Sequence, residues 1–464
     1  METTMKNIIL STDSYKTSHY LQYPLGTENV SSYIEARSGL QIMFFGLQAY
    51  LKKIAGSVVS VSDVIKAAEF CKAHGVPFNH DGWMDIATRL NGKLPVRIEA
   101  LPEGTIVKSG VPMVQIMNTD PRHAWLTSYL ETALLRAVWY PSTVATVSMK
   151  ARSIIKHFLE MTSDNPDAEL PFKLHDFGAR GVSSGESAEL GGMAHLVNFA
   201  GSDTIEGVLA AAEYYGPSDL MAGFSIPAAE HSTITSWGPD RERDAYANMI
   251  DQYGGDGKIY AVVSDSYDIY KACGEIWPSL KEKIDNKGGL LVIRPDSGDP
   301  IKVTLDVVSI LADKMGYSVN SKGYKVLPDN IRIIQGDGVD NQAIFDILTN
   351  FEKHGFSASN IAFGMGGGLL QKCNRDTFKF AMKCNAIFID GEWKDVYKKP
   401  ATDSSKSSKA GRQIVVKDGD FLKAARADSN TGLDNRLQIV YENGEILRTQ
   451  TFEEVREVAR KSLQ

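Results

Sequence analysis

Charged residues follow short apolar runs at several points in the middle of this chain. The runs are FKLHDFGARG (172–181), GFSIPAAEHS (223–232), IYAVVSDSYD (259–268), GLLVIRPDSGDP (289–300), IRIIQGDGVD (331–340) and NIAFGMGGGLL (360–370). Their charged members are His175, Asp176, Arg180, His231, Asp265, Arg294, Asp296 and Asp337. A histidine among anion-binding groups suits proton transfer or acceptance of a phosphoryl group. The alternative for His231 is an ordinary hydrogen-bonded histidine.

Arg294 and Asp296 stand two residues apart in IRPDSG. Side chains two apart in a strand share a face, so both can reach one ligand; the alternative is a structural ion pair. Asp265 is predicted to join them, although it could also cap the next helix. No histidine stands three or four residues from His231, so a helical zinc pair is not predicted.

Two glycine clusters and one aromatic residue suggest the kind of ligand. Gly336–Gly338 and Gly364–Leu369 (GDG and GMGGGL) come late in the series of runs. Glycines there let backbone N–H groups approach phosphate oxygens, which predicts a phosphorylated ligand. Phe177 and Arg180 offer an aromatic face and a cation three residues apart, which suits a flat heteroaromatic ring. A core phenylalanine is the alternative for Phe177.

The elements that must position these residues alternate between strand and helix. Each apolar run reads as a short strand, and stretches of helical period such as IKVTLDVVSILADKM follow most of them. This alternation predicts a parallel α/β barrel over 146–384, irregular but similar to a TIM barrel, with the site at the carboxyl ends of the strands. The N- and C-terminal parts, 1–145 and 385–464, are predicted to form a β-rich α+β domain. It has antiparallel strands at 93–118, helices at 123–139 and 146–159, and C-terminal hairpins.

Composition narrows the class of protein. The 464 residues are 43% hydrophobic and 23% charged, which is typical of a soluble globular protein. The net charge of −7 argues against binding to nucleic acid or an anionic membrane. No apolar run is long enough to span a bilayer. The four cysteines are scattered, which favours the cytoplasm. Asp403–Arg412 is predicted to be a mobile loop.

Seven motifs in collinear order resemble the nicotinamide phosphoribosyltransferases, which are type II phosphoribosyltransferases. They are STDSYK, KLHDFGARGVSS, PAAEHSTIT, VVSDSYDIY, IRPDSG, IQGDGVD and FGMGGGLLQK. The resemblance runs over nearly the whole chain and is densest from Lys173 to Lys383. It implies a homodimer with shared active sites that joins nicotinamide to phosphoribosyl pyrophosphate. It also implies Mg²⁺ carried by the pyrophosphate, with no metal ligands in the chain, and ATP coupled through a phosphohistidine at His231.

The resemblance also assigns roles to individual residues. Phe177 and the partner subunit's Tyr15 would sandwich the nicotinamide ring, and Asp203 would accept from its amide nitrogen. Arg180 and Arg294 would lie beside the ring and ribose. Asp296, Gly336 and Asp337 would hold ribose hydroxyls, and Gly366 and Gly367 the 5′-phosphate. The cations assigned to phosphate and pyrophosphate are Arg37, Arg375, Lys383, Lys398 and Lys406.

Three features depart from the family pattern. The segment after Arg37 is short, Met365 stands where some relatives have serine, and Ala261 replaces a polar residue beside the ring pocket. The rival substrate is nicotinate. Its carboxylate at ~4 Å from Asp203 would cost about 4 kcal/mol at an effective dielectric near 20, which favours nicotinamide. A non-catalytic metabolite-binding protein is expected to have lost part of the site, and aldolase chemistry needs a strand-end lysine that the barrel strands lack.

Overall fold

The computed structural model describes residues 7–217, 219–402, 407–429 and 432–463. The chain divides into two compact units. Unit 1 comprises Met1–Thr146, Ala211–Asp219 and Cys373–Gln464, and unit 2 comprises Val147–Ala210 and Leu220–Lys372. Each unit is held together by its own sheet.

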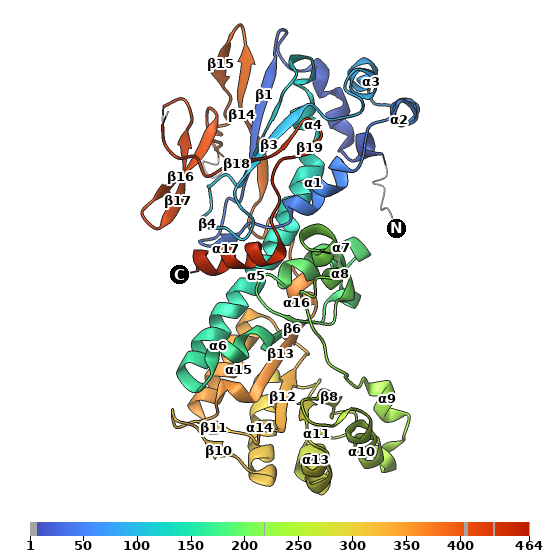
Figure 1. Cartoon of the computed structure of the whole chain (residues 1–464), viewed down its shortest axis with the longest axis vertical. Helices are drawn as coiled ribbons and strands as arrows, with labels where there is room; N and C mark the ends of the chain where they lie inside the picture. The colour runs from blue at the N-terminus through green and yellow to red at the C-terminus, as the bar shows by residue number, and fades with distance from the viewer. Residues whose placement is uncertain (1–6, 218, 403–406, 430–431, 464) are drawn as a thin grey trace. The chain divides into compact units, whose positions relative to one another are not determined.

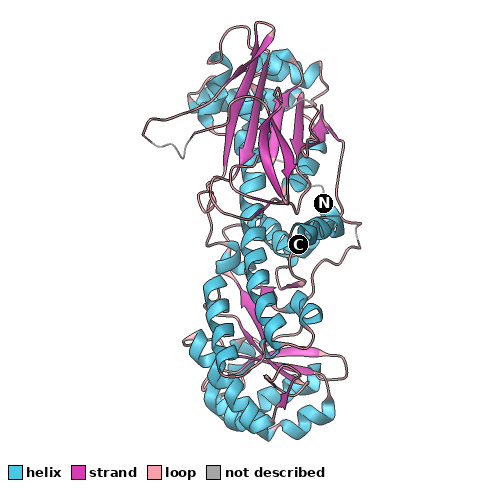
Figure 2. Cartoon of the chain, turned by 90° about the vertical axis from the view of Figure 1, so that its left-hand side faces the viewer, coloured by secondary structure: helices cyan, strands magenta, loops and turns pink. Residues whose placement is uncertain are grey.

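The main sheet of unit 1 is antiparallel and has seven strands in the order β15-β14-β1-β5-β3-β18-β19. Figure 2 shows these strands side by side. In chain order the strands are β1 (Asn29–Glu35), β3 (Val96–Ala100), β5 (Val114–Asn118), β14 (Ala381–Ile389), β15 (Glu392–Asp395), β18 (Gln438–Glu442) and β19 (Glu445–Ile446). Asn443 and Gly444 have φ of 51° and 89°, as the tight turn between β18 and β19 requires. The predicted antiparallel strands and this hairpin are confirmed.

Helices and smaller strand pairs complete unit 1. The helices are α1 (Leu47–Ala55), α2 (Val61–His74), α3 (His80–Thr88), α4 (Leu126–Tyr129), α17 (Phe452–Ser462) and the 3-10 helix η2 (Ser14–Leu21). The pairs are β2 (Ile42–Met43) with β4 (Ile106–Val107), and β16 (Gln413–Asp418) with β17 (Phe421–Arg426). Capping boxes at Ser60 and Thr451 begin α2 and α17. Trp83, Trp125 and Tyr129 pack edge to face in the core.

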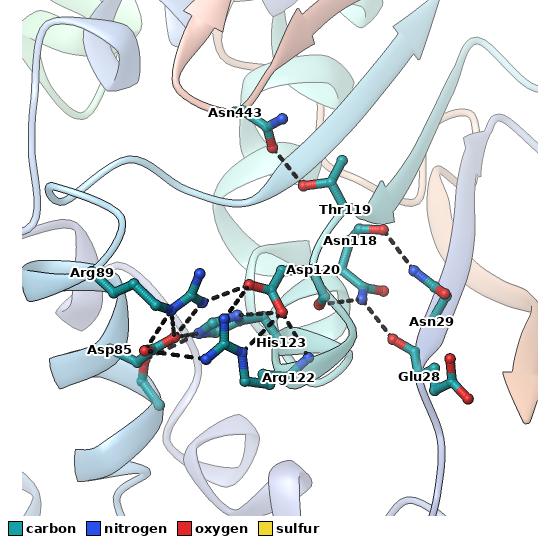
Figure 3. A network of polar contacts seen from close by, with 11 residues as sticks. Glu28, Asn29, Asp85, Arg89, Asn118, Thr119, Asp120, Arg122, His123 and Asn443 are labelled. Atoms are coloured by element: carbon teal, nitrogen blue, oxygen red, sulfur yellow. Dashed lines mark hydrogen bonds and ion pairs between the residues drawn. The ribbon is translucent and has the colours of Figure 1, made fainter.

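An ion-pair network fastens α3 to the turn after β5 (Figure 3). Arg89, which directly follows α3, lies 2.5 Å from an oxygen of Asp85 on α3 and 2.5 Å from an oxygen of Asp120. Arg122 pairs with Asp120 at 3.2 Å. The buried ring of His123 stands between the two carboxylates, 3.4 Å from Asp85 and 3.8 Å from Asp120. The network thereby holds two segments together that are about 35 residues apart in sequence.

The sheet of unit 2 is parallel and has six strands in the order β7-β6-β13-β12-β9-β8. They are β6 (Leu174–Asp176), β7 (Gly201–Ser202), β8 (Ile259–Val263), β9 (Leu290–Arg294), β12 (Ile331–Gln335) and β13 (Ile361–Met365). Single bridges join Phe224 to Gly201 on β7 and Ala228 to Ala261 on β8. One extended segment therefore spans both free edges and closes the sheet into an irregular barrel, as predicted.

Helices follow the barrel strands, as the alternating pattern predicts (Figure 1). They are α7 (Gly185–His195), α8 (Ile205–Tyr215), α9 (His231–Thr235), α10 (Glu242–Tyr253), α13 (Lys281–Lys287), α14 (Pro300–Met315), α15 (Asn341–Lys353) and α16 (Gly367–Leu370). Asp299 and Asp340 cap α14 and α15 with their side chains. Shorter elements are α6 (Pro166–Glu169), α11 (Ile269–Lys271), the π-helix Ala272–Ile276, α12 (Trp277–Ser279), β10 (Ser318–Val319) and β11 (Lys325–Val326). Ala261, Val292 and Ile334 form the core inside the barrel.

Two sequence-based expectations differ from the structure. The helices predicted at 123–139 and 146–159 are largely one 32-residue helix, α5 (Glu131–Thr162), which continues through Pro141. The boundary predicted between 384 and 385 falls inside β14, and β14 pairs along β1. Residues 373–384 therefore belong to unit 1, as do residues 211–219. In the described part of the chain, no helix has both the length and the apolar character of a membrane span.

Candidate active site

Four predicted residues meet at the carboxyl end of the barrel in unit 2. His231 Nε2 lies 3.5 Å from Asp296 Oδ2 and 3.8 Å from Asp265 Oδ1. Arg294, the last residue of β9, reaches Asp296 with its guanidinium at 3.4 Å. The structure thus brings together side chains from three separate strand-end runs. One histidine, two carboxylates and one arginine form a single polar cluster.

Asp265 is held rigidly but keeps one oxygen without a partner. Its side chain is 4% exposed. Oδ2 accepts a hydrogen bond from Ser297 at 2.5 Å, and Oδ1 has no hydrogen-bond partner among the described residues. The alternative role as a helix cap is wrong, because Asp268 caps α11 by accepting from the backbone N–H groups of Tyr270 and Lys271. Asp265 is therefore available to the cluster.

Asp296 lies in an excess of negative charge. Burial raises the pKa of its carboxyl, and nearby Asp265 and Asp337 act in the same direction. Arg294 and His231 act in the opposite direction without cancelling the shift. A cationic ligand or a positively charged reaction centre would relieve this excess.

His231 is placed with both ring nitrogens near polar groups. It is the first residue of α9, and its side chain is 47% exposed. Nδ1 lies 3.0 Å from the hydroxyl of Ser266, while Nε2 faces the two carboxylates. Because carboxylates only accept hydrogen bonds, this arrangement favours a proton on Nε2 and a lone pair on Nδ1.

Phe177 forms a half-buried platform at the mouth of the barrel. Its backbone N–H donates to the carbonyl of Met365 at 3.1 Å, and its ring packs over the barrel core. The ring also lies directly against β13, since a Cβ on Gly364 would come within 2.0 Å of its Cε2. The alternative of a core phenylalanine is supported in part, because the ring packs against the barrel core while staying partly exposed. Arg180 is exposed and lies three residues further on, in the short 3-10 helix η5 (Ala179–Gly181).

Asp203 lies beside this platform. It follows β7, and its backbone N–H donates to the carbonyl of Asp176, the neighbour of Phe177, at 2.9 Å. Its Oδ1 accepts a hydrogen bond from the hydroxyl of Ser225. Burial lowers the pKa of nearby His175, although Asp203 acts in the opposite direction. The backbone hydrogen bond from Asp203 to Asp176 thus holds the acceptor carboxylate of Asp203 close to the aromatic ring of Phe177.

The glycine clusters approach the same end of the barrel. A Cβ on Gly366 would lie 3.2 Å from the carbonyl oxygen of Phe177, and one on Gly336 would lie 3.2 Å from the Phe177 ring. Gly367 begins α16, and its backbone nitrogen would lie 3.6 Å from a Cβ on Gly181. Asp337 follows Gly336, and its carbonyl accepts from the Gln335 amide at 2.8 Å. Phe177 thus occupies the space beside Gly336 and Gly366, whereas a Cβ on Gly367 would meet no atom within 4 Å, so the backbone there is open to close approach by a ligand.

A cavity of about 580 Å³ lies inside the barrel. Its lining includes His175, Ser225, Val292 and Ile334, and also Leu290 and Ile361 at the amino ends of β9 and β13. Its wall is mainly apolar. It adjoins Asp203 through Ser225, which lines the cavity and donates to that carboxylate.

The remaining predicted residues lie in unit 1. Lys383 on β14 is partly buried, and burial lowers the pKa of its ammonium group. The cations of Arg37, Lys398 and Arg375 lower it further, while Glu131 acts in the opposite direction. Four of the predicted cations therefore form one positive cluster within this unit. Tyr15 on η2 is 61% exposed, and Lys406 lies outside the described residues.

Among the described residues, one group has the spacing of metal ligands, and it lies outside this site. Asp85, Asp120 and His123 in unit 1 place their ligand atoms within 4.8 Å of one another. Arg89 and Arg122 already neutralise both carboxylates, and burial lowers the pKa of His123 despite Asp120 and Asp85. A divalent ion would add two uncompensated charges, so this network is structural. His195 bonds Ser148 and the carbonyl of Gly201 instead of joining His231.

Sequence reasoning did not single out Ser225 and Ser266, and it assigned Gly364 to a phosphate loop. Ser225, Ser266 and Ser297 hold Asp203, His231 and Asp265. Each stands within a quoted motif, but serine is common beside strand ends. Only the spatial pairing distinguishes them from turn residues.

Comparison with solved structures identifies the fold first. The fold is similar to a crystal structure described as nicotinate-nucleotide pyrophosphorylase from Pyrococcus furiosus. The TM-score is 0.62 at 17% identity, covering 100% of this chain and 97% of the other. Human nicotinic acid phosphoribosyltransferase gives a TM-score of 0.61 at 16% identity, covering 97% and 93%.

Sequence matches then narrow the assignment. Residues 172–445 match the nicotinate phosphoribosyltransferase (NAPRTase) family, and residues 7–98 match the nicotinamide phosphoribosyltransferase N-terminal domain. The chain belongs to the nicotinate phosphoribosyltransferase family. It is 52% identical to a nicotinamide phosphoribosyltransferase of Xanthomonas campestris over 97% of this chain and 98% of the relative. The protein of the same name from Mycoplasma pneumoniae is 32% identical over 87% and 94%.

Proposed function

We propose that this protein is an enzyme that transfers the phosphoribosyl group of phosphoribosyl pyrophosphate to nicotinamide. The products are nicotinamide mononucleotide and pyrophosphate, and the role is salvage of NAD. The observation that carries the proposal is the pairing of Phe177 with Asp203, whose backbone is bonded to the residue before Phe177. An aromatic platform next to an acceptor carboxylate suits a flat ring that bears a carboxamide. The relatives named above support the same activity.

The reaction needs little from the protein at the attacking atom. The pyridine nitrogen already has a lone pair, so no general base is required. Departure of pyrophosphate builds positive charge on the ribose, as in other transfers with oxocarbenium character. The excess of negative charge around Asp296 would stabilise that ribose. Stacking on Phe177 would hold the ring in line for attack.

The other site residues complete the proposed complex. Arg180 and Arg294 lie beside the ring and ribose, Asp296, Gly336 and Asp337 hold hydroxyls, and Gly366 and Gly367 cradle the 5′-phosphate. Phosphate and pyrophosphate are neutralised by Arg37, Arg375, Lys383, Lys398 and Lys406. We propose that the partner subunit of a homodimer supplies Tyr15 and cations of this set, as the family resemblance implies. The compartment that we propose is the cytoplasm.

His231 is proposed to accept a phosphoryl group from ATP, so that ATP hydrolysis favours synthesis. A histidine with one nitrogen facing carboxylates and the other carrying a lone pair suits this role. The carboxylates of Asp265 and Asp296 would suit a divalent cation nearby, because Asp265 Oδ1 has no hydrogen-bond partner among the described residues. Mg²⁺ carried by pyrophosphate would help to neutralise the leaving group.

Nicotinate is the second candidate substrate, since the family that matches most of the chain bears its name. The purified protein should be assayed with the ribosyl donor and nicotinamide, nicotinate or quinolinate, with and without ATP. We expect the highest kcat/KM with nicotinamide and an increase with ATP. A higher kcat/KM with nicotinate would refute the substrate assignment.

The Asp203→Ser variant tests the residue that is proposed to discriminate between nicotinamide and nicotinate. It removes the charge that repels nicotinate, so it should narrow the ratio of kcat/KM for nicotinamide over nicotinate, by up to roughly three powers of ten. Both substrates are measured under identical ATP. A variant that retains the full ratio would mean that another group sets the preference.

A further inference from the structure

Ser225 and Asp203 lie on neighbouring extended segments at the mouth of the barrel. Ser202 N–H donates to the carbonyl of Phe224 at 2.9 Å, and Phe224 N–H donates to the carbonyl of Ala200 at 2.8 Å. These bonds join β7 to the segment that closes the barrel. The backbones before Asp203 and Ser225 are therefore fixed relative to each other.

The Ser225 hydroxyl holds one oxygen of the Asp203 carboxylate. It donates to Oδ1, and this direction is required because an ionised carboxylate is only an acceptor. Among the residues that the structure describes, no other group donates to this carboxylate. Oδ2 thus keeps its lone pairs for a ligand.

His175 does not replace Ser225 in this role. Burial lowers the pKa of His175, so its ring is neutral near pH 7. The ring packs beneath β7, where a Cβ on Gly201 would come within 2.6 Å of Nδ1. It fills space beside Asp203 and makes no hydrogen bond to the carboxylate in the described part of the chain. The orientation of Asp203 therefore depends on Ser225.

We infer that Ser225 is a positioning residue that determines specificity for the carboxamide. By holding Oδ1, its hydroxyl sets the carboxylate so that Oδ2 accepts a hydrogen bond from the amide N–H of nicotinamide. The inference rests on the proposed function. The terminal torsion of an aspartate is broad and two-fold, so an unheld carboxylate must be ordered when the substrate binds. Holding it beforehand avoids this cost.

The effect should be specific to one substrate. Removing the hydroxyl leaves the charge of Asp203 in place, so nicotinate is still repelled. Nicotinamide, in contrast, loses an acceptor that was oriented before binding, Oδ2 of Asp203. We expect its KM to rise roughly tenfold, as is usual for weakening one hydrogen bond to a charged group. The KM for phosphoribosyl pyrophosphate and kcat should stay within about twofold.

The test uses the near-isosteric pair Ser225→Val and Ser225→Thr, together with Ser225→Ala. Residue 225 directly follows Phe224, which forms a β-bridge with Gly201, and β-branched side chains are well accepted in strand-like segments. The Thr variant keeps a hydroxyl and should retain the KM of the wild type for nicotinamide. The Val and Ala variants should both show the increase. Ser153→Ala is the matched control, because within the described part of the chain its hydroxyl bonds only the carbonyl of Met149 on α5.

Asp203→Asn separates this inference from the proposed function. If Asp203→Asn changes the ratio of nicotinamide to nicotinate use and Ser225→Val does not, the positioning role is refuted while the proposed function stands. If neither variant changes the ratio, the proposed role of Asp203 fails as well. An equal rise in both KM values with a fall in kcat would indicate general disturbance and would also refute the positioning role.

Discussion

Gly364 is the position where one added methyl group should reveal what Phe177 does. Gly364 lies on β13, and its neighbour Met365 pairs with Asp176 at the end of β6. A Cβ on Gly364 would lie 2.0, 2.2 and 2.7 Å from three carbons of the Phe177 ring. Gly364→Ala therefore acts on the platform without touching a charged group.

The size of the effect follows from these distances. Carbon atoms in contact are separated by about 3.5 Å, so the ring of Phe177 must move by roughly 1.5 Å from the 2.0 Å position. The Phe177 backbone is bonded to Met365, so the side chain has to rotate away. A misplacement of about 1 Å at a reacting centre costs about a hundredfold in rate. We expect kcat/KM for nicotinamide to fall by about two powers of ten.

The assay is steady-state kinetics with nicotinamide and phosphoribosyl pyrophosphate, together with a thermal unfolding curve for each variant. Gly274→Ala is the control, because its nearest neighbour would be Ile310 at 3.8 Å. The double variant Gly364→Ala/Phe177→Ala completes a cycle. Once the ring is absent, the added methyl group should cost little further activity.

Two results would refute this reasoning. A folded Gly364→Ala variant with the kcat/KM of the wild type would mean that the ring does not support the substrate at its observed place. A hundredfold loss that persists in the Phe177→Ala background would mean that the methyl group acts on something other than the ring.

Three further predictions concern charge. His231→Ala should abolish stimulation by ATP while slow ATP-independent turnover remains, as measured with and without ATP; unchanged coupling would exclude the phosphoryl acceptor. Lys383→Met should raise the KM for phosphoribosyl pyrophosphate about tenfold and leave that for nicotinamide unchanged; equal effects on both would contradict this. Burial raises the pKa of Asp176 to about 6, so native stability falls as pH rises from about 4 to 6. Asp176→Asn should therefore add roughly 3 kcal/mol to the unfolding free energy at pH 7.5 and under about 1 kcal/mol at pH 4 by denaturant titration; an equal gain at both would refute it.

The sequence predicts the barrel and the place of the site because parallel strands end at one mouth. His231, Asp265, Arg294 and Asp296 come from separate runs, yet each follows an apolar strand, so their meeting was expected. The contact of Gly364 with the Phe177 ring was not expected, because the whole GMGGGL segment was predicted to be a phosphate-binding loop. Whether one of its glycines faces a phosphate or a ring depends on the register between β13 and β6.

The limits of unit 1 were harder to predict than those of unit 2. β14 directly follows the barrel in sequence, and its residues up to 384 were assigned to the barrel. The residues of β14 do not themselves indicate which strand it pairs with. That partner, β1, lies about 350 residues earlier in the chain. Local pattern decides whether a segment is a strand, but pairing over such a distance depends on the whole chain.

The place of β1 in its sheet has a consequence for synthesis on the ribosome. One edge of β1 pairs with β5, which ends at Asn118, and the other pairs with β14, which ends at Ile389. At about 5–20 residues per second, some 270 residues must still be translated after β5, which takes roughly 15–55 s. During that interval β1 presents an unpaired edge, the kind of surface on which nascent chains aggregate. Chaperones should therefore matter most for this protein after β5 has been synthesised and before β14 has been.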